Sequence, residues 1–201
     1  MQNRFDEGVS WLQQRAEQWQ NSNNFVYHIH WHEALFELGR DNPEQALAIY
    51  DERLIAPIQD DFYLDVCNAA SLLWRLEMLG IDVGDRWQLL KPYGRRTADS
   101  ELVFPTLHYL LAPARLGDQQ AMNDALSQLK QWQQDGSSQG QVVAEVGAPL
   151  AEAICALSAK NYQSAAQQLA ELQPKLFKIG GSHAQRALFT DMQTWAEQQA
   201  A

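Results

Sequence analysis

The residues of this chain best suited to chemistry are four histidines, two arginines and one glutamine. An imidazole can bind a metal or transfer a proton near neutral pH, and a guanidinium can bind a carboxylate or a phosphate. An amide side chain can both donate and accept hydrogen bonds. The candidate groove residues are His28, His32, Arg75, His108, His183, Gln185 and Arg186.

His28 and His32 are one helical turn apart, whereas His30 falls on roughly the opposite side of a helix. This spacing occurs in zinc sites, but zinc needs a third and usually a fourth ligand, and no cysteine or carboxylate stands at a matching offset. We interpret the pair as core or groove histidines bonded to neighbouring side chains, with metal binding as the alternative. The sequence therefore predicts no tight metal site and no cofactor.

The first arginine stands with other polar residues on an otherwise apolar helical stripe. Asn68, Ser71 and Arg75 project within a narrow arc, so the guanidinium needs an acceptor there. We interpret Arg75 as half of a buried pair with an acidic residue of an adjacent helix. The alternative is an arginine that binds an anion on the wall of a groove.

The second arginine follows a pair of glycines, Gly180 and Gly181. Ser182 and Gln185 have the S-x-x-Q spacing of a capping box, which predicts the start of a helix. The free amides of a helix start and Arg186 in its first turn would also suit a small anion. Because a capping box uses two of those amides itself, we favour the capping interpretation.

The other reactive residue types form no catalytic signature. No G-x-S-x-G motif occurs, and Cys67 and Cys155 stand in no cysteine-enzyme motif and no C-x-x-C pair. We therefore predict no catalytic residue, and we expect both cysteines to be small buried apolar residues in a reducing compartment.

Charge and hydropathy restrict the partners and the location. A net charge of −10 and a pI near 4.8 oppose binding to nucleic acid or to an anionic membrane. The first residues carry charges where a signal peptide needs an apolar core, and we expect no apolar run that approaches the roughly 18 residues of a membrane span. We expect a cytoplasmic protein.

These side chains must be positioned by helices, because every long segment has helical period and Gln is abundant while Val is scarce. The sequence predicts an all-α fold in one helical-repeat domain, 1–201, made of about ten helices. The alternative to a solenoid is a plain helical bundle. The expected helices lie near 4–21, 25–40, 43–56, 62–79, 84–98, 103–116, 118–135, 141–159, 161–179 and 182–199.

Residues 25–51 predict two helices joined by a tight turn, the unit of helical repeats. Pro43 suits a first helical position, and Ala46 and Tyr50 suit its inner face. Similar turns are expected at 116–118 and 160–162, which together indicate an irregular tetratricopeptide-like solenoid. Glycines that suit left-handed helix ends are Gly39, Gly80, Gly117, Gly180 and Gly181.

Four segments in a fixed order carry a family resemblance, namely residues 28–35, 64–76, 83–87 and 180–186. Together they resemble the tetratricopeptide repeat protein 38 family, and across nearly the whole chain they correspond to its C-terminal half. The resemblance implies an all-helical repeat protein and supplies no settled activity. Where the family pattern tends to have acidic residues, this chain has Asn68, Thr106 and Ala187, so we carry no catalytic role over.

Two functions of different classes follow from these observations. We favour a non-enzymatic scaffold that binds a protein or a peptide in its helical groove. The alternative is an enzyme, or a protein that binds a small molecule or anion, that uses the candidate histidines and arginines. Residues 4–21 are expected to cap the stack, and a second copy of the chain is a further expected partner there.

Overall fold

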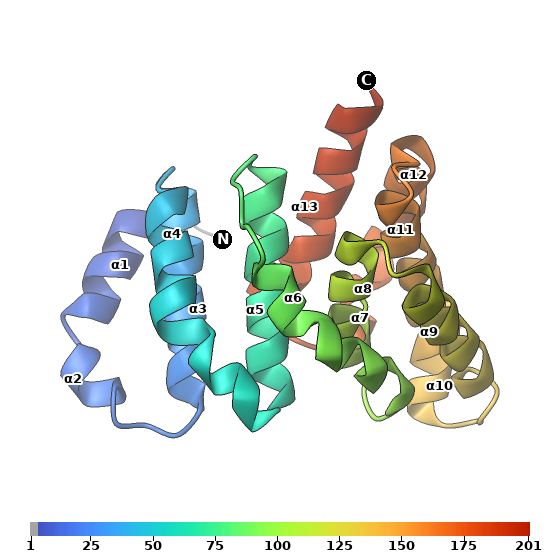
Figure 1. Cartoon of the computed structure of the whole chain (residues 1–201), viewed down its shortest axis with the longest axis horizontal. Helices are drawn as coiled ribbons and strands as arrows, with labels where there is room; N and C mark the ends of the chain where they lie inside the picture. The colour runs from blue at the N-terminus through green and yellow to red at the C-terminus, as the bar shows by residue number, and fades with distance from the viewer. Residues whose placement is uncertain (1–3) are drawn as a thin grey trace. The chain divides into compact units, whose positions relative to one another are not determined.

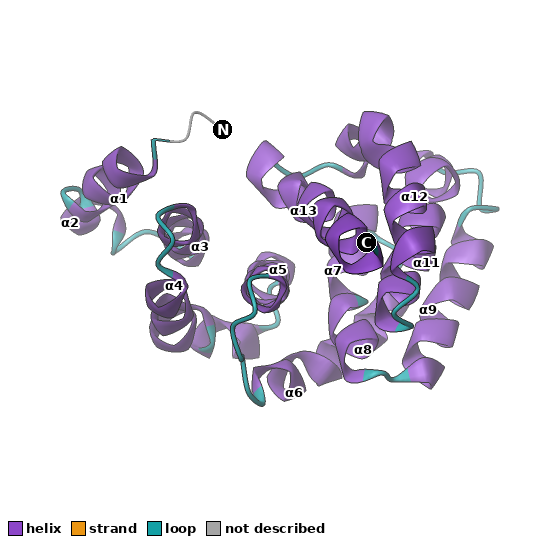
Figure 2. Cartoon of the chain, turned by 90° about the horizontal axis from the view of Figure 1, so that it is seen from above, coloured by secondary structure: helices purple, strands orange, loops and turns teal. Residues whose placement is uncertain are grey.

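The computed structural model describes residues 4–201, and these residues are helical with no strand among them (Figures 1 and 2). The all-α prediction is therefore confirmed. The chain divides into two compact units, Met1–Gly84 (unit 1) and Asp85–Ala201 (unit 2). The single helical-repeat domain over residues 1–201 stays a prediction.

Unit 1 is built around two long helices, α3 (Phe25–Gly39) and α5 (Tyr63–Met78), which pack against each other. Its remaining elements are α1 (Phe5–Gln13), α2 (Ala16–Trp19), α4 (Pro43–Ile49), a π-helical segment η1 (Tyr50–Leu54) and a 3-10 segment η2 (Ala56–Asp60).

Unit 2 begins with the short helix α6 (Arg86–Leu90) and ends with the long helix α13 (His183–Ala200). Between them lie η3 (Lys91–Ala98), α7 (Val103–Tyr109), α8 (Leu111–Leu116), α9 (Gln119–Trp132), α10 (Ser138–Val142), η4 (Val143–Gly147), α11 (Ala148–Ser158), α12 (Tyr162–Leu172) and η5 (Gln173–Ile179).

Several expected helices are interrupted by 3-10 or π segments. Pro57, Pro92 and Pro174 are the second residues of the 3-10 segments η2, η3 and η5. Proline lacks the backbone N–H that an α-helix needs in its interior, so each proline ends one helical segment and starts the next. The chain direction can therefore change inside regions that the sequence predicts as continuous helices.

Three pairs of helices are joined by turns of the same construction, at the positions that the sequence predicts. In each turn one residue has a left-handed backbone and the next is the N-cap of the second helix, as for Gly117 (φ 67) and Asp118. The amide of that N-cap residue donates to a carbonyl five residues earlier, in Asn42–Glu37 (3.0 Å), Asp118–Pro113 (2.9 Å) and Asn161–Ala156 (2.9 Å). The hairpins are α3–α4, α8–α9 and α11–α12.

Gly39 does not take the left-handed backbone that we expected, and that element of the prediction is wrong. In the first turn it is Asp41 that has a positive φ of 58°. A Cβ at Gly39 would lie 2.5 Å from the Phe5 ring of α1, and a Cβ at Gly8 of α1 would lie 2.7 Å from the Phe36 ring of α3. Two glycines thus allow α1 and α3 to approach through reciprocal aromatic contacts.

Several large apolar side chains of unit 1 are buried, and so are the two residues predicted for an inner face, Ala46 and Tyr50. Trp31, Ala46 and Tyr50 have no exposed surface, and Trp74 is 6% exposed. Trp11, in contrast, is 54% exposed on α1, and the Arg15 guanidinium lies 4.7 Å from its ring centroid.

Both cysteines are free thiols. Cys67 is buried on α5, as predicted, whereas Cys155 on α11 is only half-buried. Burial, with the nearby charge of Glu152, raises the pKa of the Cys155 thiol to about 11. The thiol is therefore protonated at neutral pH.

One helical run, Ser138–Ser158, is long and apolar enough to cross a membrane by length and composition, with a mean hydropathy of 1.3. The expectation that no apolar run approaches a span is wrong for this segment. The core helix of a soluble protein has the same length and composition. In the most apolar 18-residue stretch of this run, half is buried inside the protein. The run is weak evidence for a membrane.

Candidate functional site

Unit 1 contains a row of buried polar residues along one face of α5. The row consists of Asp65, Asn68, Ser71 and Arg75, which are spaced three or four residues apart and are all buried. From α3, the Trp31 indole N–H donates to Ser71 Oγ at 3.0 Å. The Ser71 hydroxyl of this row therefore belongs to the contact between the two long helices.

The predicted histidine pair lies beside this row. The rings of His28 and His32 are 4.7 Å apart, edge to face, and His28 Nδ1 lies 3.1 Å from Asn68 Oδ1. Burial lowers the pKa of His28 and, with the nearby charge of His28, lowers the pKa of His32 to about 4. Both rings are thus neutral at pH 7, and a neutral His28 donates from Nδ1 to the amide oxygen of Asn68.

No group of three His, Cys, Asp or Glu residues that could hold a metal ion occurs in residues 4–201. His30 points to the other side of α3, as expected. The centroid of its ring lies 5.0 Å from that of the Trp19 ring, and its Nδ1 lies 3.2 Å from Glu33 Oε2. His30 therefore makes contacts that are separate from those of His28 and His32.

Arg75 is bound within its own helix. Its Nη1 donates to the carbonyl oxygen and the hydroxyl of Ser71, at 3.3 and 3.1 Å, and its guanidinium carbon lies 5.9 Å from the Trp31 ring centroid. Ser71, one helical turn earlier, thus supplies some of the acceptors that the buried guanidinium needs. A carboxylate partner on an adjacent helix stays a prediction.

Asp65 is a buried acid that the sequence pattern does not single out. It is 2% exposed, and neither of its carboxylate oxygens accepts a hydrogen bond from residues 4–201. Burial, with a contribution from the charge of Asp60, raises the pKa of Asp65 to about 6. The carboxyl group therefore changes charge close to physiological pH without any donor to stabilise the ionised form.

The remaining candidates lie in unit 2, and the first of them is a core residue. His108 is 1% exposed, and its Nδ1 donates to the carbonyl of Phe104 at 2.8 Å. The ring lies between the rings of Phe104 (4.3 Å) and Phe189 (5.7 Å). These contacts are those of a packed histidine.

The capping box at the start of α13 is confirmed. The Ser182 amide donates to Gln185 Oε1 at 2.7 Å, and the Gln185 amide donates to Ser182 Oγ at 3.3 Å. Arg186 turns back and donates to the carbonyls of Gly180 (3.2 Å) and Gly181, and its Nη2 lies 3.4 Å from His183 Nδ1. The structure thus brings His183 and Arg186 together, with Gln185 used in the cap.

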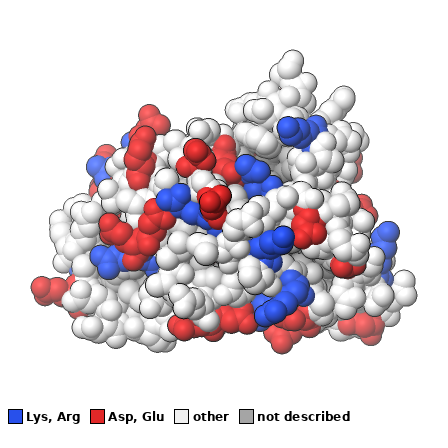
Figure 3. All heavy atoms as spheres, viewed as in Figure 1, with Lys and Arg blue, Asp and Glu red and all other residues white. Residues whose placement is uncertain are grey.

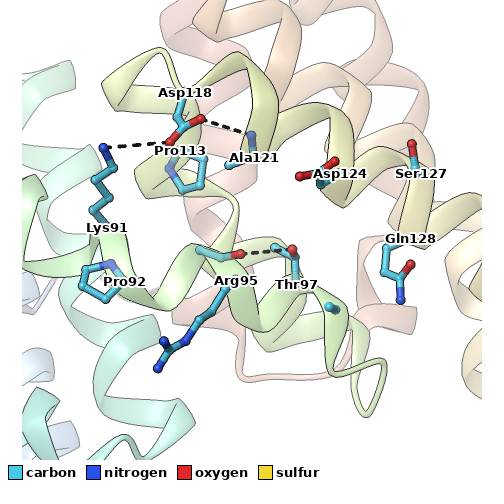
Figure 4. Close-up of a pocket in the computed structure, with 12 residues that line it drawn as sticks. Lys91, Pro92, Arg95, Thr97, Pro113, Asp118, Ala121, Asp124, Ser127 and Gln128 are labelled. Carbon is cyan, nitrogen blue, oxygen red and sulfur yellow. Dashed lines mark hydrogen bonds and ion pairs between the residues drawn. The ribbon is translucent and has the colours of Figure 1, made fainter.

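A surface groove of about 580 Å³ lies elsewhere in unit 2, between η3 and α9 (Figure 4). Its floor includes Gly94 and Pro113, which approach so closely that a Cβ at Gly94 would lie 2.7 Å from Pro113 Cγ. One wall is a stripe of α9 that runs from its N-cap Asp118 through Ala121 and Asp124 to Gln128. The other wall is formed by η3, with Lys91, Arg95 and Thr97.

Some polar groups of the groove already have partners. Asp118 accepts from the Ala121 amide at 3.1 Å and lies 4.0 Å from Lys91 Nζ, as the dashed lines in Figure 4 mark. The Thr97 hydroxyl donates to the Gly94 carbonyl at 3.0 Å. These bonds fix the frame of the groove.

Three other polar side chains of the groove make no ion pair within the described residues. Arg95 is exposed and Gln128 is half-buried, and neither makes an ion pair or a side-chain hydrogen bond within the described residues of the chain. Asp124 is exposed and accepts only from Gln120 Nε2 at 2.9 Å, so its carboxylate has no cation partner among these residues. A ligand can therefore bind these three side chains without breaking an existing ion pair.

A second hollow, of about 420 Å³, is more open and follows the outer face of α1, where Asp6, Ser10, Trp11 and Arg15 line it. It involves one helix only. On the face seen in Figure 3, acidic and basic side chains are interspersed over the surface.

Compared with known proteins, the chain matches no family model, and no solved structure matches it.

Proposed function

We propose that this protein is a non-enzymatic binding scaffold that holds a short extended peptide segment of a partner protein in the η3–α9 groove of unit 2. The proposal rests on one observation: a groove of about 580 Å³ is lined by Arg95, Asp124 and Gln128, and none of these side chains makes an ion pair within the described residues. Ligand sites of proteins typically have volumes of roughly 300–1,000 Å³ and a small number of polar groups that can bind the ligand.

The length of the α9 wall favours a short segment. Ten residues separate Asp118 from Gln128, which corresponds to about 15 Å along a helix. An extended peptide rises about 3.3 Å per residue, so about four or five residues match this wall. The half-buried Gln128 amide can pair with both an N–H and a C=O of such a peptide.

The hydroxyl groups of the groove favour binding over chemistry. Ser127 donates to the Asn123 carbonyl at 2.8 Å, and Thr97 donates to the Gly94 carbonyl. Among the residues that the structure describes, neither hydroxyl has a histidine or another base as its partner, and an activated nucleophile needs one. Binding is therefore the function that these residues serve best.

The three helical hairpins with the same turn support a further element of the proposal. Repeated hairpins of this kind are the building units of tetratricopeptide-like stacks, which bind peptides on extended surfaces. We place the chain among such scaffolds on this basis and on its resemblance to the tetratricopeptide repeat protein 38 family.

A random library of displayed five-residue peptides, selected on the full chain, tests the proposal. We expect enriched peptides whose binding is lost in Ala121→Trp, because the indole would occupy the groove beside Asp118 and Asp124. Ala170→Trp on α12 is the control, since Ala170 is an exposed alanine that does not line the groove. Thermal melting must show that both variants are folded. Equal binding to both variants, or no enrichment at all, would exclude the η3–α9 groove.

A further inference from the structure

The charge of the α9 wall restricts the kind of peptide that can bind. Asp124 lies in the middle of the stripe from Asp118 to Gln128, and it is exposed to solvent. Among the described residues its carboxylate accepts one hydrogen bond, from the neutral amide of Gln120 at 2.9 Å. A carboxylate in this state can accept further hydrogen bonds, and a cationic donor makes the strongest ones.

In residues 4–201 no other charge of the groove is paired with that of Asp124. Lys91 faces Asp118 at 4.0 Å, so these two charges balance each other at one end of the groove. Arg95 belongs to the opposite wall, and in Figure 4 its side chain extends away from α9. Within the described residues the α9 wall therefore presents one negative charge, that of Asp124, which no cation pairs with.

From these charges we propose that the groove selects peptides with a lysine or arginine whose side chain binds Asp124. The inference rests on the proposed peptide-binding function. Gln128 would fix the register of the peptide. It lies one helical turn from Asp124, about 6 Å along the axis, which is close to the rise of two residues in an extended chain. The basic side chain thus binds Asp124 while the backbone two positions away pairs with Gln128.

Two pools of five-residue peptides provide the test, one with Lys and one with Glu at the central position and all other positions random. Binding to the full chain is measured by fluorescence anisotropy of labelled pools. We expect the Lys pool to bind more tightly to the parent, Asp124→Asn to weaken it about two- to fivefold, as for an exposed ion pair, and Asp124→Lys to reverse the preference.

Glu171→Lys is the matched control, because Glu171 is an exposed helical carboxylate that also accepts from a glutamine one turn earlier, Gln167 at 3.2 Å. It changes the net charge as Asp124→Lys does, and we expect it to keep the preference for Lys. If the pools bind equally, or if both charge reversals act alike, the inference is wrong while peptide binding stands. If neither pool binds, the proposed function fails with it.

Discussion

At the scale of single residues, the buried polar groups of unit 1 differ in how they are compensated. The Trp31 indole and His28 have partners on α5, Ser71 and Asn68, so their burial costs little. Asp65 has no such partner. Its ionised form therefore destabilises the fold.

Replacing Asp65 with asparagine should stabilise the protein above pH 6. Since burial raises the pKa of Asp65 from 3.8 to about 6, its contribution to stability is full below pH 3.8 and is lost as the pH rises through 6. We expect Asp65→Asn to raise the free energy of unfolding by about 1–3 kcal/mol at pH 8, with the upper end set by 1.36 kcal/mol per pKa unit. Urea denaturation at pH 8 and pH 4 measures this. A gain of the same size at both pH values would show that the charge of Asp65 is not the cause.

His32 should give the opposite pH dependence. Its folded pKa, near 4, lies below the ordinary value of 6.5, so its contribution to stability is full above pH 6.5 and is lost as the pH falls through 4. In the parent the trends of Asp65 and His32 oppose each other between pH 4 and pH 6. We expect the melting temperature of Asp65→Asn to fall more steeply on acidification than that of the parent. Parallel curves for the two proteins would contradict this.

At the scale of elements, the approach of α1 to α3 depends on two glycines. Adding a methyl group at Gly39 would force the Phe5 ring away, because the new Cβ would lie 2.5 Å from it. We expect Gly39→Ala to cost about 1–3 kcal/mol, the usual range for overpacking, and to expose the amides of α1 to hydrogen exchange. The double variant Gly39→Ala/Phe5→Leu should recover some of the loss. If the double variant is as unstable as the sum of the two single changes, the contact is not the cause.

Local chemistry explains which elements could be predicted from the sequence. Pro43, Gly117 and Asn161 each favour one backbone state or one cap, and the Ser182–Gln185 box needs only four neighbouring residues. Gly39 could be recognised as special but not explained, because its reason is a ring from α1. Asp41 and Lys160 also have a positive φ, but an aspartate or a lysine in a sequence indicates a left-handed backbone less strongly than a glycine does.

The groove could not be predicted, because η3 and α9 come together only in the fold. Asp118, Ala121, Asp124 and Gln128 on their own have the pattern of a solvent-exposed helical stripe. Asp65 is visible in the sequence as an acidic residue. Its burial without a hydrogen-bond donor could not be predicted, because it depends on the atoms that surround it in the fold. Among the predicted candidates, Arg75, His108 and Gln185 proved to have partners within a few residues.

At the scale of the whole molecule, the two units should differ in their response to damage. Trp31 has no exposed surface and contacts α5 in unit 1, so Trp31→Ala should destabilise that unit by about 3–5 kcal/mol. We expect faster hydrogen exchange in α3 and α5 and nearly unchanged exchange in α11, α12 and α13, because contacts are dense within each unit. Trp11→Ala, on an exposed face, is the control. Equal loss of protection in both units would mean that the chain unfolds as one cooperative body.

The low reactivity expected of the two native thiols would give a low background in chemical labelling. Only a thiolate reacts quickly with maleimides or oxidants, and a pKa of about 11 leaves about one Cys155 thiol in ten thousand ionised at pH 7. Cys67 is buried on α5. A cysteine placed at Ser127, on the exposed rim of the η3–α9 groove, would then react far ahead of both native thiols. A fluorophore at that position could follow the arrival and departure of a peptide in real time, with no native residue removed except the serine that it replaces.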